Sequence, residues 1–212
     1  MMELEHVLPA DIEKTSFRII EKELHEMGRE IPEDKKHVIL RVIHTTADFD
    51  YAENLCFSEN VIQKAVSVLK KGCTIVTDTN MALSGINKNA LNTLGCKAVC
   101  FMADRDVAET AKTKGLTRAA VSVDKAAEIR EPVIFAAGNA PTALIRLNEH
   151  IKNNSFIPEL VIGCPVGFVN VIQSKEIIMQ SGVPYIVAKG RKGGSNVAAA
   201  ICNALMYMIT RK

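Results

Sequence analysis

Short apolar runs alternate with amphipathic segments through most of this chain. Each run has the length and composition of a β-strand, and each is followed by a segment with helical spacing. Strands that alternate with helices indicate a parallel sheet that is covered by helices on both faces. The pattern therefore predicts an α/β domain with a central five-stranded parallel sheet, whose strands are Cys73–Thr77, Lys97–Phe101, Val133–Ala137, Leu160–Gly163 and Tyr185–Ala188.

Helical spacing precedes the first predicted strand. One helix covers Thr15–Met27, a second begins near Pro32 and ends near Thr46, and a third covers Asn60–Lys71. The C-terminal segment 196–209 is apolar on more than one face, so we expect it to pack against the sheet or a second subunit. No linker rich in proline, glycine or serine interrupts the chain. We therefore expect one domain over residues 1–212 with an N-terminal helical lead-in.

Composition narrows the classes of function. Of the 212 residues, 48% are hydrophobic and 24% are charged, which is ordinary for a globular protein. The formal net charge of +2 gives no reason to expect binding to nucleic acid or to a membrane surface. The sequence has no N-terminal leader and no apolar run long enough to cross a membrane, so we expect a cytoplasmic protein.

Cysteine and histidine spacing argues against a metal site. The six cysteines form no CxxC pair, and the five histidines add no zinc-type spacing. We therefore predict buried, reduced thiols and no bound metal. Cys164 lies on a glycine-proline loop where a helix N-terminus could activate a thiol, but no histidine is near it in sequence. A nucleophilic thiol has little support, because it needs a basic or positive partner.

The loops after the predicted strands carry the residues best placed to bind a ligand. Three of these loops are rich in glycine, which lets backbone N–H groups approach a ligand closely: residues 138–142, 163–168 and 190–196. The last loop adds Arg191 and Lys192, so it is the strongest predicted anion site. One glycine loop alone could be a tight turn, but three on one edge favour a ligand site. Neither a P-loop nor a dinucleotide fingerprint is present, which disfavours a nucleotide hydrolase or an ordinary dehydrogenase.

His44 is the first candidate for acid/base chemistry. It lies at the predicted end of the second helix, one turn after Arg41 and just before Asp48 and Asp50. The negative end of the helix dipole and the two aspartates favour the imidazolium form, so His44 could donate a proton near neutral pH. The alternative is that His44 only caps the helix end and pairs with Asp48.

Two further positions have two interpretations each. Ser16 stands near the predicted start of the first helix, where its hydroxyl could be an N-cap or could contact an anionic ligand. Arg118 begins an apolar stretch, which is typical of either a buried ion pair or a fork that binds a carboxylate.

Several segments together resemble one family, precorrin-8X methylmutase and its cobalt-precorrin-8 counterpart in cobalamin biosynthesis. The resemblance runs from about Ser16 to the C-terminal helix, and the ordered combination of strings is specific although each string alone is weak. The matching segments are Thr15-Ser16-Phe17, Arg41-Val42-Ile43-His44, Thr117-Arg118, residues 138–144 (GNAPTAL), residues 165–169 (PVGFV) and residues 190–195 (GRKGGS).

The resemblance implies a flavodoxin-like three-layer α/β/α fold, a homodimer, and an isomerase that moves a methyl group from carbon 11 to carbon 12 of a corrin macrocycle. It also implies that His44 is the proton donor and acceptor, that Ser16 and Arg41 contact the substrate, and that Arg118 binds substrate carboxylates. No redox cofactor or metal is required of the protein, because the methyl shift is a rearrangement within one molecule. With the strand-end loops, the predicted substrate contacts are Ser16, Arg41, Thr45, Asp78, Met81, Arg118, Asn139, Gly167, Phe168, Arg191, Gly193, Gly194 and Ser195.

The residues after His44 differ from the family pattern. Family members can carry small residues and glycine there, whereas this chain has residues 45–50 as Thr-Thr-Ala-Asp-Phe-Asp. We favour the cobalt-containing substrate over the metal-free one. Two alternatives from other classes are a corrinoid carrier that binds without catalysis, and an α/β enzyme that uses residues 190–195 to bind a phosphate-bearing ligand.

Overall fold

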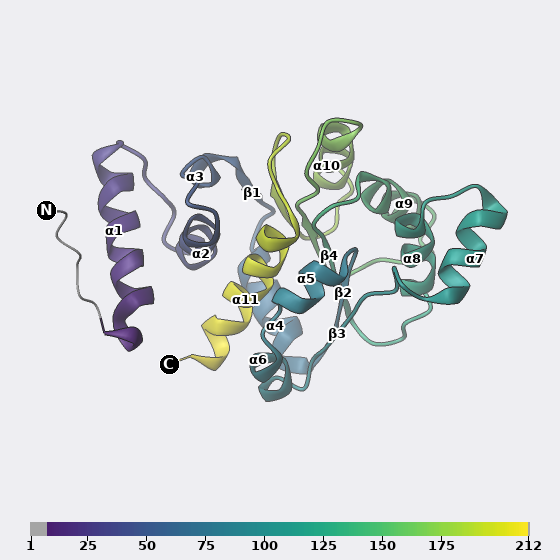
Figure 1. Ribbon diagram of the computed structural model, residues 1–212, viewed down its shortest axis with the longest axis horizontal. Helices are drawn as coiled ribbons and strands as arrows, with labels where there is room; N and C mark the ends of the chain where they lie inside the picture. Colours follow the sequence, from purple (N-terminus) through teal and green to yellow (C-terminus); the bar gives the residue numbers. More distant parts are fainter. Residues whose placement is uncertain (1–7, 212) are drawn as a thin grey trace, which may run out of the picture.

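The computed structural model describes residues 8–211, apart from the side chain of Ala10. A six-stranded mixed sheet forms its centre, in the order β1-β6-β5-β4-β2-β3 (Figure 1). β1 pairs antiparallel with β6, and all other neighbours pair in parallel. The strands are β1 (Leu55–Phe57), β2 (Thr74–Thr77), β3 (Lys97–Val99), β4 (Val133–Ala137), β5 (Leu160–Gly163) and β6 (Tyr185–Ala188).

Helices cover both faces of this sheet. One face carries α8 (Arg118–Ala126), α9 (Pro141–Lys152) and α10 (Val171–Met179), with α7 (Arg105–Lys114) packed against α8. The other face carries α2 (Lys36–Thr46), α4 (Val61–Lys71), α6 (Lys88–Thr93) and α11 (Ser195–Thr210). α1 (Ile12–Glu26) packs on α2 and lies at the left end of the molecule in Figure 1. The short elements are η1 (Pro9–Asp11), α3 (Tyr51–Asn54) and α5 (Asn80–Gly85).

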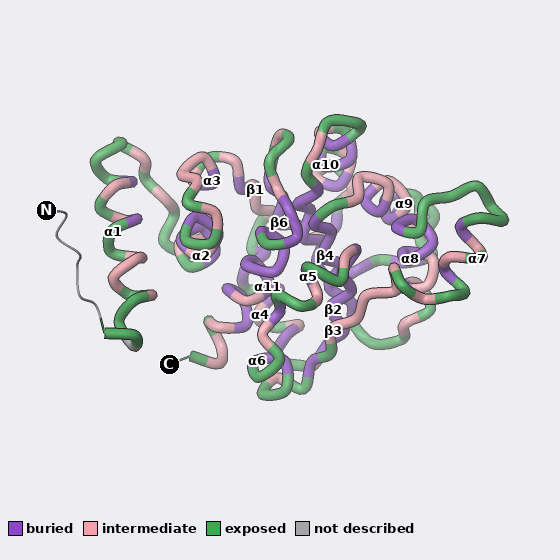
Figure 2. The backbone as a smooth tube through the Cα atoms, viewed as in Figure 1, coloured by how far each residue is buried: buried purple, intermediate pink, exposed green. Residues whose placement is uncertain are grey.

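The core is divided by the sheet into two apolar layers. Alternate residues of each strand face opposite sides, so Ile134 packs towards α11 whereas Phe135 packs towards α9. Figure 2 shows that the buried chain is concentrated in the central strands and in α11. α11 contacts α2, α4, α5, α6 and the sheet, which explains why its sequence is apolar on more than one face. The prediction that this segment packs on the sheet is confirmed.

All five predicted strands are present at the predicted positions, but the sheet has one further strand. β4, β5 and β6 have the predicted bounds, while β2 and β3 are one and two residues shorter than predicted. The five-stranded, all-parallel sheet is wrong, because β1 adds an antiparallel sixth strand beside β6. β1 is three residues long and follows α3 directly, so no periodic pattern marks it. When the five parallel strands are numbered along the chain, their order across the sheet is 2-1-3-4-5. Doubly wound folds with this order bind ligands beyond the carboxyl ends of their strands.

Two helix starts differ from the prediction. α1 begins at Ile12, because η1 leads directly into it, so Ser16 lies inside the helix and the N-cap interpretation is wrong. α2 begins at Lys36 rather than near Pro32, since the carbonyl of Pro32 accepts the Lys35 N–H in a turn. The predicted end of α2 is confirmed. No helix within residues 8–211 has both the length and the apolar character needed to cross a membrane.

Candidate functional site

The three glycine-rich loops lie next to one another, as predicted, because β4, β5 and β6 are neighbours in the sheet. Backbone hydrogen bonds join the loops after β5 and β6. The Gly194 N–H donates to the carbonyl oxygen of Cys164 at 2.8 Å, and the Gly167 N–H donates to that of Arg191 at 3.3 Å. Gly193 packs so closely on this carbonyl of Cys164 that an added Cβ would collide with it. Glycine is therefore required at residue 193 by close backbone approach.

Asp78 holds the loop after β4. Its carboxylate accepts the backbone N–H groups of Gly138, Asn139 and Ala140 at 2.7, 2.8 and 2.6 Å. The side chain is buried, and burial raises the pKa of Asp78 while the three N–H donors oppose that rise. The geometry assigns Asp78 to the shape of the 138–140 loop, and its carboxylate oxygens face the protein rather than solvent.

Ser195 starts α11 beneath the same edge. Its hydroxyl lies 2.7 Å from that of Thr79, which also caps the N-terminus of α5. The Cα of Ser195 lies so near Gly138 that an added Cβ there would be only 2.6 Å away, so Gly138 allows α11 to approach the sheet. Ser195 is buried and anchors the loop from below.

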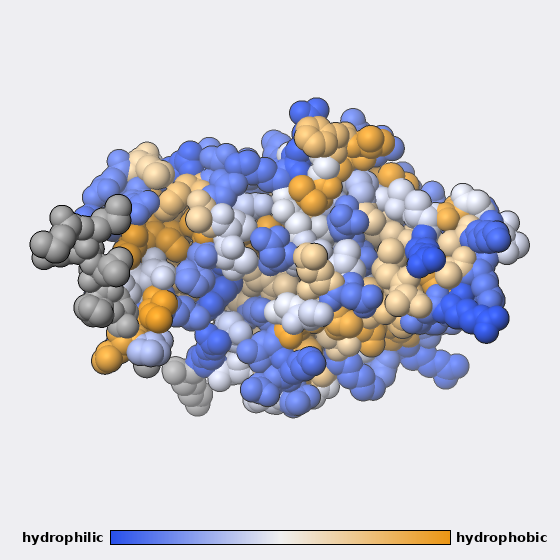
Figure 3. Space-filling view, viewed as in Figure 1, coloured by the Kyte–Doolittle hydropathy of each residue, from blue (hydrophilic) through white to orange (hydrophobic). Residues whose placement is uncertain are grey.

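Apolar side chains project into solvent above this edge. Phe168 is 83% exposed and Met81 is 73% exposed. The Arg191 guanidinium lies 5.4 Å from the centre of the Phe168 ring, so a cation and an aromatic face are paired at the loop surface. Figure 3 shows apolar surface near the start of α10, the helix that follows Phe168. Large side chains exposed in this way are typical of a binding surface for an apolar ligand or protein.

His44 is exposed in the last turn of α2. Its ring packs edge-on against Phe17 of α1, with the ring centres 5.6 Å apart. The alternative that His44 pairs with Asp48 is wrong, because the carboxylates of Asp48 and Asp50 have another partner. Both carboxylates instead accept hydrogen bonds from the Lys192 ammonium at 2.6 and 2.7 Å, and residues 8–211 contain no hydrogen bond between them and His44.

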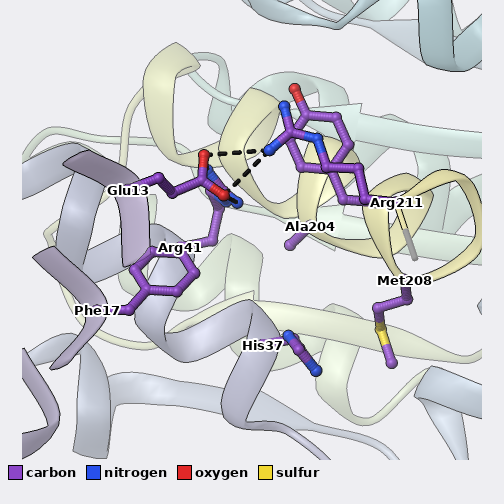
Figure 4. Close-up of a pocket in the computed structure, with 8 residues that line it drawn as sticks. Glu13, Phe17, His37, Arg41, Ala204, Met208 and Arg211 are labelled. Carbon is purple, nitrogen blue, oxygen red and sulfur yellow. Dashed lines mark hydrogen bonds and ion pairs between the residues drawn. The ribbon is translucent and has the colours of Figure 1, made fainter. Parts of the chain in front are cut away.

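Arg41 is held by a carboxylate from α1 (Figure 4). Its guanidinium donates two hydrogen bonds to Glu13, at 2.8 and 2.7 Å, and lies between the rings of Phe17 and Tyr207. Arg211 also donates to Glu13. The Arg41 hydrogen bonds lower the pKa of Glu13 to about 2, so the carboxylate is ionised at neutral pH. Arg41 lines a pocket of about 300 Å³, but its fork is already occupied by Glu13.

A second pocket, of about 250 Å³, is also lined by Arg41. It is lined by Thr45 of α2, Gly85 of α5 and Asn196 at the start of α11. The Thr45 hydroxyl donates to the Arg41 carbonyl at 2.8 Å. This pocket therefore extends from the turn of α2 that carries His44 to the first turn of α11 at the glycine loops.

Comparison with known proteins shows to which family the chain belongs. The precorrin-8X methylmutase family matches residues 11–208. The chain belongs to the precorrin-8X methylmutase family. It is 47% identical to the cobalt-precorrin-8 methylmutase of Salmonella typhimurium, over 94% of this chain and 95% of that protein. It is 41% identical to the cobalt-precorrin-8 methylmutase of Leptospira interrogans, over 97% of this chain and 96% of that protein. A crystal structure of precorrin-8X methylmutase from Thermus thermophilus superimposes with a TM-score of 0.84, at 36% identity over 93% of this chain and 96% of that one.

In this methylmutase-family chain, Arg118 occupies the first residue of α8 and is exposed. The buried ion pair considered for it is wrong, because Arg118 makes no ion pair within residues 8–211. The hydroxyl of Thr117 caps α8 and donates to that of Thr142 at 2.8 Å, which joins the start of α8 to the loop of Asn139. Asn139 is also exposed. The fork interpretation of Arg118 stays open, and its guanidinium is free to meet a ligand at the sheet edge.

The residues predicted to act on or contact the substrate form two groups in the structure. Ser16, Arg41, His44 and Thr45 come from α1 and α2, and the other ten come from loops and helix starts at the sheet edge. Lys192 connects the groups through Asp48 and Asp50. Ser16 is half-buried in the second turn of α1, in the turn after Glu13.

Two residues of this site were missed by the sequence reasoning. Glu13 holds Arg41, and Lys175 of α10 lies buried beneath the loop after β6. Neither belongs to a motif, and a lysine within a helical apolar pattern is normally expected at the surface. The buried thiol at Cys164 was correctly given little weight as a nucleophile, because it is inaccessible and burial raises its pKa to about 12. No cluster of three or more potential metal ligands occurs in the described part of the chain.

Proposed function

We propose that this chain catalyses the reaction of its family with His44 as the acid and base. Family membership carries the activity: the chain is an isomerase of the precorrin-8X methylmutase type, which acts in cobalamin biosynthesis. The observation that supports His44 is its exposure in the last turn of α2, because Asp48, which follows this helix end, pairs with Lys192 of the loop after β6. The proposal requires that a ligand lying over the sheet edge extends to this helix end.

The chemistry needs one group that can give and take back a proton. Protonation of the macrocycle makes migration of the methyl group from carbon 11 to carbon 12 easier, and the same imidazole can then recover the proton. The methyl group leaves one carbon and joins another in the same molecule, so the reaction balances without an oxidant or an external methyl donor. Phe17 restricts the His44 ring by its edge-on contact, which favours one orientation towards the ligand.

A flat macrocycle edged with carboxylates needs an apolar slot and a cationic rim. We assign the slot to Phe168 and Met81, whose side chains are exposed above the sheet edge. Arg118 and Arg191 supply exposed guanidinium groups for the carboxylates, and the amide of Gly193 can add an N–H donor. Arg41 is proposed to act mainly on the shape of the α1–α2 surface, since Glu13 occupies its fork.

The substrate form and the assembly are also proposals. We favour a cobalt-containing substrate, in line with the printed names of the Salmonella and Leptospira proteins. We propose a homodimer in the cytoplasm and a flavodoxin-like classification of the fold, the latter supported by the 2-1-3-4-5 order of the parallel strands. Light scattering decides the oligomeric state, with a monomer at all concentrations contradicting the dimer.

The decisive test is His44→Ala with cobalt-loaded and metal-free substrate, followed by absorption spectroscopy. We expect turnover to fall by at least about 10²-fold, the scale of a lost acid/base group. Thermal unfolding and product binding should change little, because the side chain is exposed. His25→Ala, an exposed histidine of α1, is the control. Near-normal turnover in His44→Ala would refute the assignment, and binding without conversion by the wild type would favour the carrier alternative.

A further inference from the structure

Lys175 is a buried cation that no step of the proposed reaction uses. Only 1% of the residue is exposed, although lysine is almost never fully buried without a partner. No carboxylate within residues 8–211 forms an ion pair with it. Its ammonium instead donates to the carbonyl oxygens of Gly190 and Lys192, both at 2.8 Å. These lengths are those of charge-assisted hydrogen bonds, so the cation is stabilised by the backbone of one loop.

That loop is the strongest predicted anion site of the chain. Gly190 and Gly194 both have positive φ, and glycine-rich segments are conformationally free unless something holds them. Here three successive carbonyls are held from below: those of Gly190 and Lys192 by Lys175, and that of Arg191 by the Gly167 N–H. In Figure 1 the loop rises between α3 and α10, the helix that carries Lys175.

Fixing these carbonyls also fixes the side chains that the loop presents. Arg191 is left exposed over Phe168, where it can meet a carboxylate. Lys192 reaches Asp48 and Asp50, which follow the helix of His44. The Lys175 ammonium therefore stabilises the backbone of the two residues whose side chains face solvent and the end of α2, Arg191 and Lys192. Burial lowers the pKa of Lys175 to about 8, whereas the two accepting carbonyl oxygens favour its ammonium form.

We propose that Lys175 is a positioning residue for substrate binding, which holds the backbone of residues 190–192 in the conformation that presents Arg191 and Lys192. The proposal rests on the proposed function, because the loop is taken to bind the carboxylate-edged substrate. A preformed loop lowers the entropy cost of binding. Loss of Lys175 is therefore expected to raise KM and to change kcat little, since the residue does not reach the reacting atoms.

The test compares Lys175→Gln and Lys175→Arg with Ile178→Val, a buried residue of the same helix that belongs to the apolar layer with Phe135 and Leu144. Lys175→Gln should raise KM about tenfold, the effect of losing a charge-assisted bond, and change kcat less than about twofold. Lys175→Arg, which keeps the charge and donors in a different shape, should raise KM about threefold. Ile178→Val should lower the melting temperature without raising KM.

Unchanged KM in folded Lys175→Gln, or an equal rise in Ile178→Val, would overturn the proposal. If Lys175→Gln does not fold, Lys175→Arg decides, and a wild-type KM in that variant would restrict Lys175 to folding. Amide hydrogen exchange in ligand-free protein tests the positioning role of Lys175 separately from the proposed function of the loop. Faster exchange at residues 193–196 in the Lys175 variant that folds, but not in Ile178→Val, supports the positioning role even if no substrate is converted. Unchanged exchange there contradicts it.

Discussion

The two halves of the proposed site are held by different kinds of interaction. At the sheet edge, charged side chains such as Asp78 and Lys175 are buried and bonded to backbone groups. On the α1–α2 side, Glu13 and Arg41 pair through their side chains, and Glu13 is partly open to solvent. A backbone contact leaves the chain only one low-energy shape, whereas a side-chain pair can separate and form again. We therefore expect the sheet edge to be the more rigid half of the proposed site, and the helical lead-in to be the half that a ligand can rearrange.

The strongest way to break this comparison is Asp78→Asn. The amide places N–H donors against the N–H groups of the 138–140 loop, so we expect a loss of about 3 kcal/mol in unfolding free energy. Urea unfolding of both proteins measures it. Asp106→Asn, an exposed aspartate of α7, is the control that should change little. A wild-type free energy in Asp78→Asn would mean that the loop is not held in this way.

The next largest effect is expected from Arg118→Ala. Its guanidinium is exposed and without an ion-pair partner in residues 8–211, so removal should raise KM for the polycarboxylate substrate about tenfold at unchanged kcat. Arg130→Ala is the matched control, because Arg130 is exposed before β4 at the opposite edge of the sheet. A fall in kcat alone would argue against a binding role for Arg118.

A smaller effect is expected from Glu13→Gln, and it should depend on pH. The pKa of Glu13 is lowered from 4.5 to about 2 in the folded state, so its contribution is fully present above about pH 4.5 and is lost as the pH falls towards 2. Since 39% of the side chain is exposed, screening reduces that contribution to about 1 kcal/mol. The free energies of unfolding of the two proteins should therefore differ by this amount at pH 7, and the difference should become small near pH 2.5. A constant difference would contradict the pair.

The smallest effect is expected from Lys192→Met. Its ion pairs with Asp48 and Asp50 lie at the surface, and pairs of this kind add little stability. The unfolding free energy should match that of the wild type within experimental error, at both low and high salt. A clear loss of stability that disappears in high salt would place Lys192 among the groups that hold the sheet edge.

Periodicity predicted the sheet well and the charged contacts poorly. β4, β5 and β6 are four or five apolar residues each, bounded by turn signals, and their burial leaves only one interpretation. β1 was not predicted, because three residues are too few to show an alternating pattern. Its pairing with β6 also depends on contacts between residues far apart in sequence. The grouping of the glycine loops followed from topology alone, since neighbouring parallel strands end at one edge.

Partners of charged groups could not be predicted, because sequence distance is a poor guide to them. Asp48 and Asp50 are close to His44 along the chain, yet Lys192, more than 140 residues away, reaches both. Glu13 and Arg41 are 28 residues apart and Lys175 holds carbonyls 15 and 17 residues later. In each case the fold, and not the local pattern, selects the partner.

The hydrogen bonds that the Asp78 carboxylate accepts from the 138–140 loop affect which ligands the crevice at the sheet edge can bind. Doubly wound folds commonly receive a ligand phosphate at the crevice where the strand order reverses, which here lies between β2 and β4. In this chain an internal carboxylate has taken that role, and the N–H groups of Gly138, Asn139 and Ala140 are already saturated. An incoming phosphate would find no free donors on this loop and would be repelled by a buried negative charge. We therefore expect this crevice to bind nucleotides poorly, and a larger ligand whose charges lie at its periphery to bind at the outer rim instead.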